Sequence, residues 1–267
     1  MISPEWWLAY LALGAFVGFF AGLLGIGGGA IMVPLLVLLF DMQGLPREQL
    51  LHLAVGTSMS TILFTSLASI RAHQSRGSIR WPIVRSMTPG IIIGGLLGAA
   101  LASAIPVTTL ALCFTAIIFA SATNMILDRK PSPSRQLPGP LGLSGVGAGI
   151  GALSSIAAMG GGFASVPYML WCNVPMINAI GTAAALGFPI AAAGTVGFVI
   201  NGWNDAGLPP WSFGYVYLPA FAGIVVTSMM VAPVGAATAH RMPTRRLKQV
   251  FAVLLYVLVA RMLVKLW

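Results

Sequence analysis

The stretch GLLGIGGGAIMVP, residues 22–34, places four glycines within five residues of an otherwise apolar run and follows them with a proline. A second stretch, SSIAAMGGGFASVP at residues 154–167, repeats this pattern, with its GGG run 133 positions after the first one. Glycine adopts positive φ readily and lets another group approach the backbone closely. The two stretches therefore predict two sharp reversals of the chain, and the rest of the fold can be worked out around them.

The composition is that of an integral membrane protein. Of the 267 residues, 58% are hydrophobic and only 7% are charged, whereas soluble domains carry about 25% charged residues. The mean hydropathy is +0.93, and apolar runs cover nearly the whole chain, so no sizeable soluble domain remains. The net charge of +9 lies in short loops between these runs, which indicates membrane topology rather than nucleic-acid binding.

The two halves of the chain carry the same motifs in the same order. Residues 128–140, rich in proline, serine and charge, have the composition of a linker between them. The motif pairs are the two GGG runs with their Val-Pro, AVGTS (54–58) with AIGTA (179–183), and GAALASAIP (98–106) with GAATAHRMP (235–243). The sequence therefore predicts a duplication, with an N-terminal repeat at 1–127 and a C-terminal repeat at 141–267.

The basic residues predict how the chain is oriented. Eleven of the fourteen lie in three segments that we expect on the cytoplasmic side, at residues 71–85, 129–135 and 241–248. The loop at 201–210 has no basic residue and is expected outside. Under these assignments residues 141–173 must leave the cytoplasm and return to it, so the chain must reverse at Gly160–Gly162.

The arm that follows these glycines is too short to cross the membrane. Its 11 residues, 163–173, would rise about 17 Å as a helix, whereas the hydrocarbon core is about 30 Å thick. We therefore expect a cytoplasmic re-entrant hairpin at 141–173 and, from the duplication, a matching hairpin at 6–40. The predicted full spans are 53–70, 86–105 and 107–127 in the first repeat, and 179–200, 213–239 and 249–266 in the second.

Three full spans per repeat is an odd number, so the second repeat enters from the opposite side. The expected fold is an all-α polytopic membrane protein of two inverted repeats, with both termini in the periplasm. The two hairpins then enter from opposite faces and can meet near the centre.

Hairpin tips at mid-membrane would present helix N-termini, whose unpaired N–H groups and dipoles favour an anion. The candidate substrate-binding residues are Gly27, Gly28, Gly29, Thr57, Ser58, Gly160, Gly161, Gly162 and Thr182. The alternative is structural, because glycines let membrane helices pack closely and buried hydroxyls often bond a carbonyl one turn back.

The sequence carries no pattern of a catalytic or metal site. Its three histidines share no ligand spacing, hydrolase and nucleotide-binding motifs are absent, and no acidic residue lies deep in a predicted span. We therefore expect a protein that is not an enzyme and holds no cofactor or metal. Its expected partners are a small anion and the lipid bilayer; coupling to protons and assembly as a homodimer stay open.

Both glycine stretches in their wider context, GFFAGLLGIGGGAIMVPLL and GALSSIAAMGGGFASVPYML, resemble the sulfite exporter TauE/SafE family, as do AVGTS, AIGTA and the linker. The resemblance covers essentially the whole chain. It implies a permease of the bacterial inner membrane for sulfite, sulfonates or related sulfur-containing organic anions. The second half departs from the first, with Ala158 where Gly25 stands and GTAAAL in place of GTSMST, so we expect the first repeat to supply more polar contacts.

The expected function is secondary transport of such an anion by alternating access between the two repeats. Two alternatives remain, an anion channel and a non-transporting membrane scaffold or accessory protein.

Overall fold

The described part of the chain is all-helical apart from one short hairpin of strands. The computed structural model describes residues 3–24, 28–127, 134–239 and 244–266. Its helices are α1 (Pro4–Leu24), α2 (Gly29–Met42), α3 (Leu50–Gln74), α4 (Trp81–Ala104), α5 (Val107–Leu127), α6 (Pro140–Ala157), α7 (Gly162–Trp171), α8 (Met176–Gly202), α9 (Leu218–Ala239) and α10 (Thr244–Leu266). The strands are β1 (Ser212–Phe213) and β2 (Val216–Tyr217).

Seven of the described helices are long and apolar enough to cross a membrane: α1, α3, α4, α5, α6, α8 and α9. The chain is therefore a multi-pass membrane protein, as the composition predicts. Of the seven, α3 and α8 are the most deeply buried, and they pack against each other at the centre of the molecule. The other helices cover this central pair.

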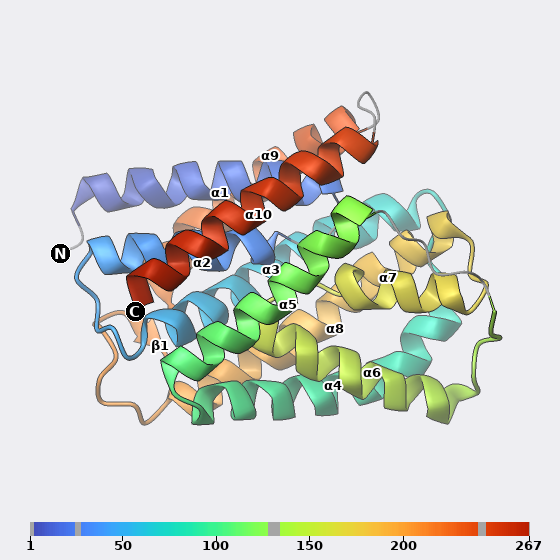
Figure 1. Ribbon diagram of the computed structural model, residues 1–267, viewed down its shortest axis with the longest axis horizontal. Helices are drawn as coiled ribbons and strands as arrows, with labels where there is room; N and C mark the ends of the chain where they lie inside the picture. Colours follow the sequence, from blue (N-terminus) through green and yellow to red (C-terminus); the bar gives the residue numbers. More distant parts are fainter. Residues whose placement is uncertain (1–2, 25–27, 128–133, 240–243, 267) are drawn as a thin grey trace.

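Each glycine stretch joins a long helix to a short one. The first pair is α1 and α2, with 21 and 14 residues, and the second is α6 and α7, with 18 and 10. The short helices rise about 21 Å and about 15 Å, less than the thickness of a hydrocarbon core. The two pairs open toward opposite ends of the molecule (Figure 1).

Two helix pairs are held in close backbone contact by glycines. Helix α1 packs along α9, where a Cβ on Gly18 would lie 2.5 Å from Cα of Ser228. Helix α4 packs along α6, where a Cβ on Gly98 would lie 2.5 Å from the carbonyl oxygen of Ala152. Small residues at such crossings let membrane helices approach closely enough for dispersion contacts along their backbones.

The strands lie in a stretch that the sequence analysis assigned to a span beginning at residue 213. Ser212 pairs with Tyr217 and Phe213 with Val216, and the helix begins only at Leu218. The turn between the strands is at Gly214, whose φ is +56° and whose missing Cβ leaves room for the backbone of Val199. The run is apolar enough for a helix, but this glycine in a left-handed conformation ends the regular pattern.

Charged side chains divide between the two ends of the described structure. Exposed arginines lie at the end where residues 75–80, 134–139 and 172–175 meet: Arg71, Arg76, Arg80, Arg85 and Arg135. The described acidic residues lie at the other end, with Arg47: Glu5, Asp41, Glu48 and Asp205. Figure 1 shows these two groups of loops at opposite ends of the long axis.

Candidate substrate site at the hairpin tips

The tips of the two hairpins touch each other beside α3. Gly29, the first residue of α2, lies so close to Ala158 that an added Cβ would overlap the Ala158 carbonyl oxygen. The same Cβ would lie 2.8 Å from Cδ1 of Ile62 on α3. Ala158 ends α6 in a left-handed conformation with φ of 47°, which a non-glycine residue adopts only where its surroundings require it. Gly29 of the first hairpin therefore packs directly against the turn of the second hairpin at Ala158.

The tip of the second hairpin seats between the two central helices. A Cβ on Gly161 would lie 2.9 Å from the carbonyl oxygen of Ala183 and 3.3 Å from the amide nitrogen of Gly187, both on α8. Gly187 faces α3, with Cβ of Ser66 3.8 Å from the position of its own missing Cβ. Gly160 and Gly161 are buried, and α7 begins at Gly162. Glycine is required here because backbone meets backbone.

Both short helices begin at these tips without a side-chain cap. Gly28, in a left-handed conformation with φ of 71°, precedes α2, and its carbonyl accepts the N–H groups of Ile31 and Met32. Gly161 precedes α7, and its carbonyl accepts the N–H of Ser165 at 3.1 Å. The first N–H groups of a helix have no partner within it and carry the positive end of its dipole. The tips thus present backbone donors suited to an anion.

Three fully buried serine hydroxyls adjoin the tips and make no hydrogen bond with any of the described residues: Ser58, Ser154 and Ser155. Ser58 lies one turn before Ile62 on α3, and Ser154 one turn before Ala158. The Oγ of Ser155 lies 3.5 Å from the position of a Cβ on Gly95 of α4. Leaving a buried hydroxyl without a partner costs about 1–3 kcal/mol, so each of these groups calls for water or a polar ligand.

Two of the predicted site residues have another partner. The Thr57 hydroxyl on α3 accepts the backbone N–H of Tyr217 at 2.9 Å, and the Thr182 hydroxyl on α8 accepts the N–H of Arg80 at 3.0 Å. We call the Thr57–Tyr217 contact the outer latch and the Thr182–Arg80 contact the inner latch. Each joins a central helix to the turn that precedes another helix, at opposite ends of the molecule.

The structure thus brings Gly28, Gly29, Gly160, Gly161 and Gly162 to the two tips, with Ser58 on α3 beside them; Gly27 lies outside the described residues. Sequence reasoning missed Ser154 and Ser155. Their signal was a pair of hydroxyls directly before the second glycine run, where the first half has Ala21 and Gly22.

Ionisable groups are sparse around the tips. Among the described residues, no group of three or more His, Cys, Asp or Glu side chains could hold a metal ion. His52, on α3 near its first turn, is buried, with Nε2 3.0 Å from the carbonyl oxygen of Ala102. What the described tips offer a ligand is backbone N–H groups and hydroxyls, that is, hydrogen bonds without a compensating buried charge.

Comparison with known proteins gives a consistent result. The family model described as sulfite exporter TauE/SafE matches residues 10–262. A probable membrane transporter protein of Haemophilus influenzae is 34% identical over 97% of this chain and 98% of its own length. Probable membrane transporter protein YdhB of Bacillus subtilis is 28% identical over 87% of this chain and 90% of its own. No solved structure gave a significant match.

Proposed function

This chain belongs to the sulfite exporter TauE/SafE family and is a membrane transporter, and from that premise we propose that it moves a small sulfur-containing anion across the bacterial inner membrane. The proposed substrates are sulfite, a sulfonate or a related sulfo-carboxylate. The proposed mechanism is secondary transport by alternating access.

One observation carries the proposal. Two helix N-termini without side-chain caps converge where Gly29 meets Ala158, and buried hydroxyls with no partner in the described part of the chain lie on the adjoining helices. An oxyanion such as sulfite accepts several hydrogen bonds, and a helix N-terminus supplies donors with a favourable dipole. Backbone outside a regular helix is tolerated at membrane depth where it is buried in protein or lines a water-filled cavity.

Paired contacts support inverted repeats, with repeats at 1–127 and 141–267. Gly14 meets Ile224 between α1 and α9, and its counterpart Gly147 meets Met87 between α6 and α4. The outer and inner latches form a second such pair, since Thr57 and Thr182 occupy equivalent positions in AVGTS and AIGTA. In each pair the partners exchange repeats, which a two-fold axis in the membrane plane would produce.

The charge distribution supports the proposed orientation. Five exposed arginines gather at one end of the described structure, while the acidic residues lie at the other end with Arg47 and, near the end of α10, Arg261. This excess of arginine at one end is what the positive-inside bias would produce in an inner membrane. The arginine end is then cytoplasmic. Both termini, together with β1 and β2, are periplasmic.

The latches suggest how the two sides open in turn. The outer latch holds the periplasmic turn around β2 on α3, and the inner latch holds the cytoplasmic turn at Arg80 on α8. We propose that one latch opens while the other stays closed, so that the site at the tips is accessible from only one side of the membrane at a time. The two equivalent halves supply the two related states.

Flux measurements on purified protein in liposomes test the proposal. Radiolabelled sulfite and a short sulfonate are offered with sulfate and a carboxylate as competitors. Saturable flux of a sulfur-containing anion, inhibited by unlabelled substrate, supports the transporter. Flux that rises linearly with concentration would indicate an anion channel, and no flux of any tested anion would favour the scaffold. Ser58→Ala should raise the substrate concentration needed for half-maximal flux. Ser86→Ala, whose hydroxyl donates to a carbonyl of its own helix, should leave that concentration unchanged.

A further inference from the structure

The two short helices that meet at the tips are buried to very different extents. Nine of the fourteen residues of α2 are buried, whereas only Ser165 and Met169 are buried among the ten residues of α7. Trp171, the last residue of α7, is exposed. A segment with few buried contacts opens at a lower cost in free energy than a segment packed in the core. The second hairpin therefore contains the looser of the two short helices.

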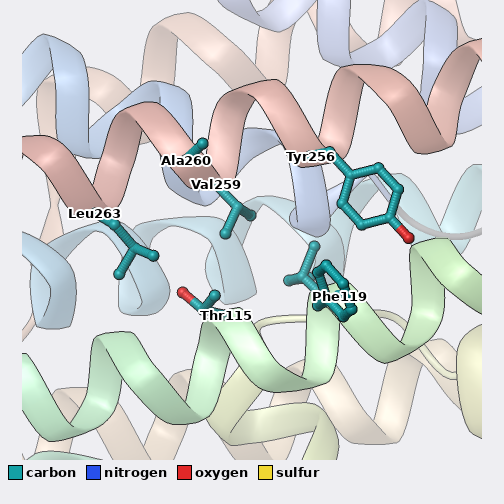
Figure 2. A pocket seen from close by; sticks show the side chains of 7 residues that line it. Thr115, Phe119, Tyr256, Val259, Ala260 and Leu263 are labelled. Atoms are coloured by element: carbon teal, nitrogen blue, oxygen red, sulfur yellow. The ribbon is translucent and has the colours of Figure 1, made fainter.

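The neighbouring helices account for this difference. Helix α10 packs against α2, which also contacts α1 and α3. The helix of the first half that corresponds to α10 is α5, and it packs against α10, α6 and α3. Figure 2 shows α5 facing α10, with Phe119 beside Tyr256. The centroids of these two rings are 5.1 Å apart, and the hydroxyls of Thr123 and Tyr256 are 2.7 Å apart. Helix α5 is thus held on α10, and α8 is the principal helix partner of α7.

The end of α7 away from the tips is held by residues of the linker between the two halves. The Trp171 carbonyl accepts the N–H groups of Ser134 and Arg135, each at 3.2 Å, and the Trp171 indole N–H donates to the Ser134 hydroxyl at 2.8 Å. The guanidinium carbon of Arg135 lies 4.7 Å from the centroid of the Trp171 ring. The Asn173 side-chain amide donates to the Arg135 carbonyl at 3.3 Å. We call these contacts between Ser134, Arg135, Trp171 and Asn173 the linker clamp.

The linker clamp can open without loss of the core. All four of its residues are exposed, so water competes for their hydrogen bonds and weakens the cation–π contact. The first hairpin is held differently at the end opposite its tip. The hydroxyl of Tyr10, which is fully buried, donates to the Gln43 side chain at 2.7 Å, and its ring packs edge-on against Phe40. The first hairpin is thus held by a buried contact and the second by exposed ones.

We propose that α7 is the moving arm of the anion site, that α2 is its fixed arm, and that Trp171 and Arg135 position the moving arm. Helix α7 is about 15 Å long, with Gly161 at the tip and Trp171 at the linker clamp, so these two residues act through α7 rather than on the anion. When the linker clamp opens, α7 tilts away from α8 and the tips become accessible from the clamp end, which is cytoplasmic in the orientation proposed above. The inference rests on the proposed anion transport and names the hairpin that moves.

Hydrogen exchange of the purified full chain tests the arm without a substrate. Backbone amides of α7 should exchange about tenfold faster than those of α2, because local opening exposes them more often. Arg135→Gln removes the cation–π contact and should speed exchange in α7 a further twofold to fivefold, roughly, while exchange in α2 and the Tm stay unchanged. Arg85→Gln, at an exposed arginine outside the linker clamp, should alter neither helix. Exchange in α7 as slow as in α2 would overturn the proposal.

A reversible cross-link tests whether the arm must move during transport. With Cys113 and Cys172 replaced by alanine, Ser134→Cys and Trp171→Cys place one thiol on each side of the linker clamp. A short bifunctional methanethiosulfonate reagent should lower the saturable flux of a short sulfonate about tenfold or more, and a reductant should restore it. A purely structural clamp would tolerate this cross-link.

The matched control joins the last helices of the two repeats. Thr123→Cys with Tyr256→Cys ties α5 to α10 in the same background, and flux should persist after this cross-link, because neither helix belongs to the moving arm. Loss of flux with both cross-links, or with neither, would overturn the proposal. Absence of sulfonate flux in every reduced protein would contradict the transport function alone, since the exchange rates of α7 and α2 test the arm by themselves.

Discussion

Replacing Gly29 by alanine should separate the hairpin tips. The new Cβ would overlap the carbonyl oxygen of Ala158, and real Cβ atoms essentially never come within 3.0 Å of another heavy atom. The two backbones must therefore part by more than about 1 Å. The contact with Cδ1 of Ile62 is easily relieved, because it is the far end of a flexible side chain. The Ala158 carbonyl has less freedom, since it belongs to a left-handed turn closing α6.

The expected cost is larger in transport than in stability. Overpacking of this kind destabilises by about 1–3 kcal/mol, so the variant should still fold and insert. A displacement of about 1 Å at a site that depends on several aligned donors can cost about 100-fold in rate. We therefore predict saturable anion flux in liposomes reduced about 100-fold, with a modest fall in Tm.

Two glycines of the second hairpin provide graded controls for the same chemical change. Gly161→Ala places a Cβ 2.9 Å from the Ala183 carbonyl oxygen and should show an intermediate loss. Gly149→Ala meets no atom within 4 Å and should transport as the wild type does. Wild-type flux in the Gly29 variant, or equal losses in all three variants, would show that transport does not depend on the contact between the tips.

Three further predictions concern the latches, Ser155 and the Tyr215–Asp205 pair. Thr57→Val and Thr182→Val each leave a backbone N–H unpaired, so each should lower the free energy of unfolding by about 1–3 kcal/mol. Labelling of cysteines introduced beside each latch by a thiol reagent should increase from the periplasmic side for the first variant and from the cytoplasmic side for the second. Ser155→Ala removes a hydroxyl that has no protein partner, so stability should be unchanged or higher while substrate affinity falls; lost stability with unchanged affinity would contradict this. Burial and the hydrogen bond to Asp205 raise the pKa of Tyr215 to about 12. Stability from this pair should be complete below pH 10 and lost between pH 10 and about 12, and melts of Tyr215→Phe should show a smaller loss over that window.

The tip at Gly160–Gly162 was accessible from the sequence because the basic segments, if cytoplasmic, predict a reversal of the chain there. The tip at Gly28 and Gly29 was accessible only through the similarity of the two halves, since the charges alone do not predict a reversal in the first half. Charge and length are properties of the chain that folding does not alter, so they predict topology well.

Other features depend on packing that sequence periodicity does not encode. Substrate binding by Thr57 and Thr182 stays a prediction, and the sequence did not indicate that each hydroxyl accepts a backbone N–H from the opposite half. Such a contact, between residues 160 positions apart for Thr57, is specified only by tertiary structure. Helix α9 begins at Leu218 rather than at the predicted residue 213 for a local reason. The left-handed conformation of Gly214 forms a turn there, although the surrounding residues are apolar enough for a helix.

Equilibrium binding of radiolabelled sulfite and a short sulfonate to the purified protein, compared for the wild type, Gly29→Ala and Gly149→Ala, tests whether the anion site lies at the meeting hairpin tips. We expect saturable binding to the wild type and to Gly149→Ala, and strongly weakened binding to Gly29→Ala. Equal binding to all three proteins would contradict the assignment of the anion site to the meeting hairpin tips.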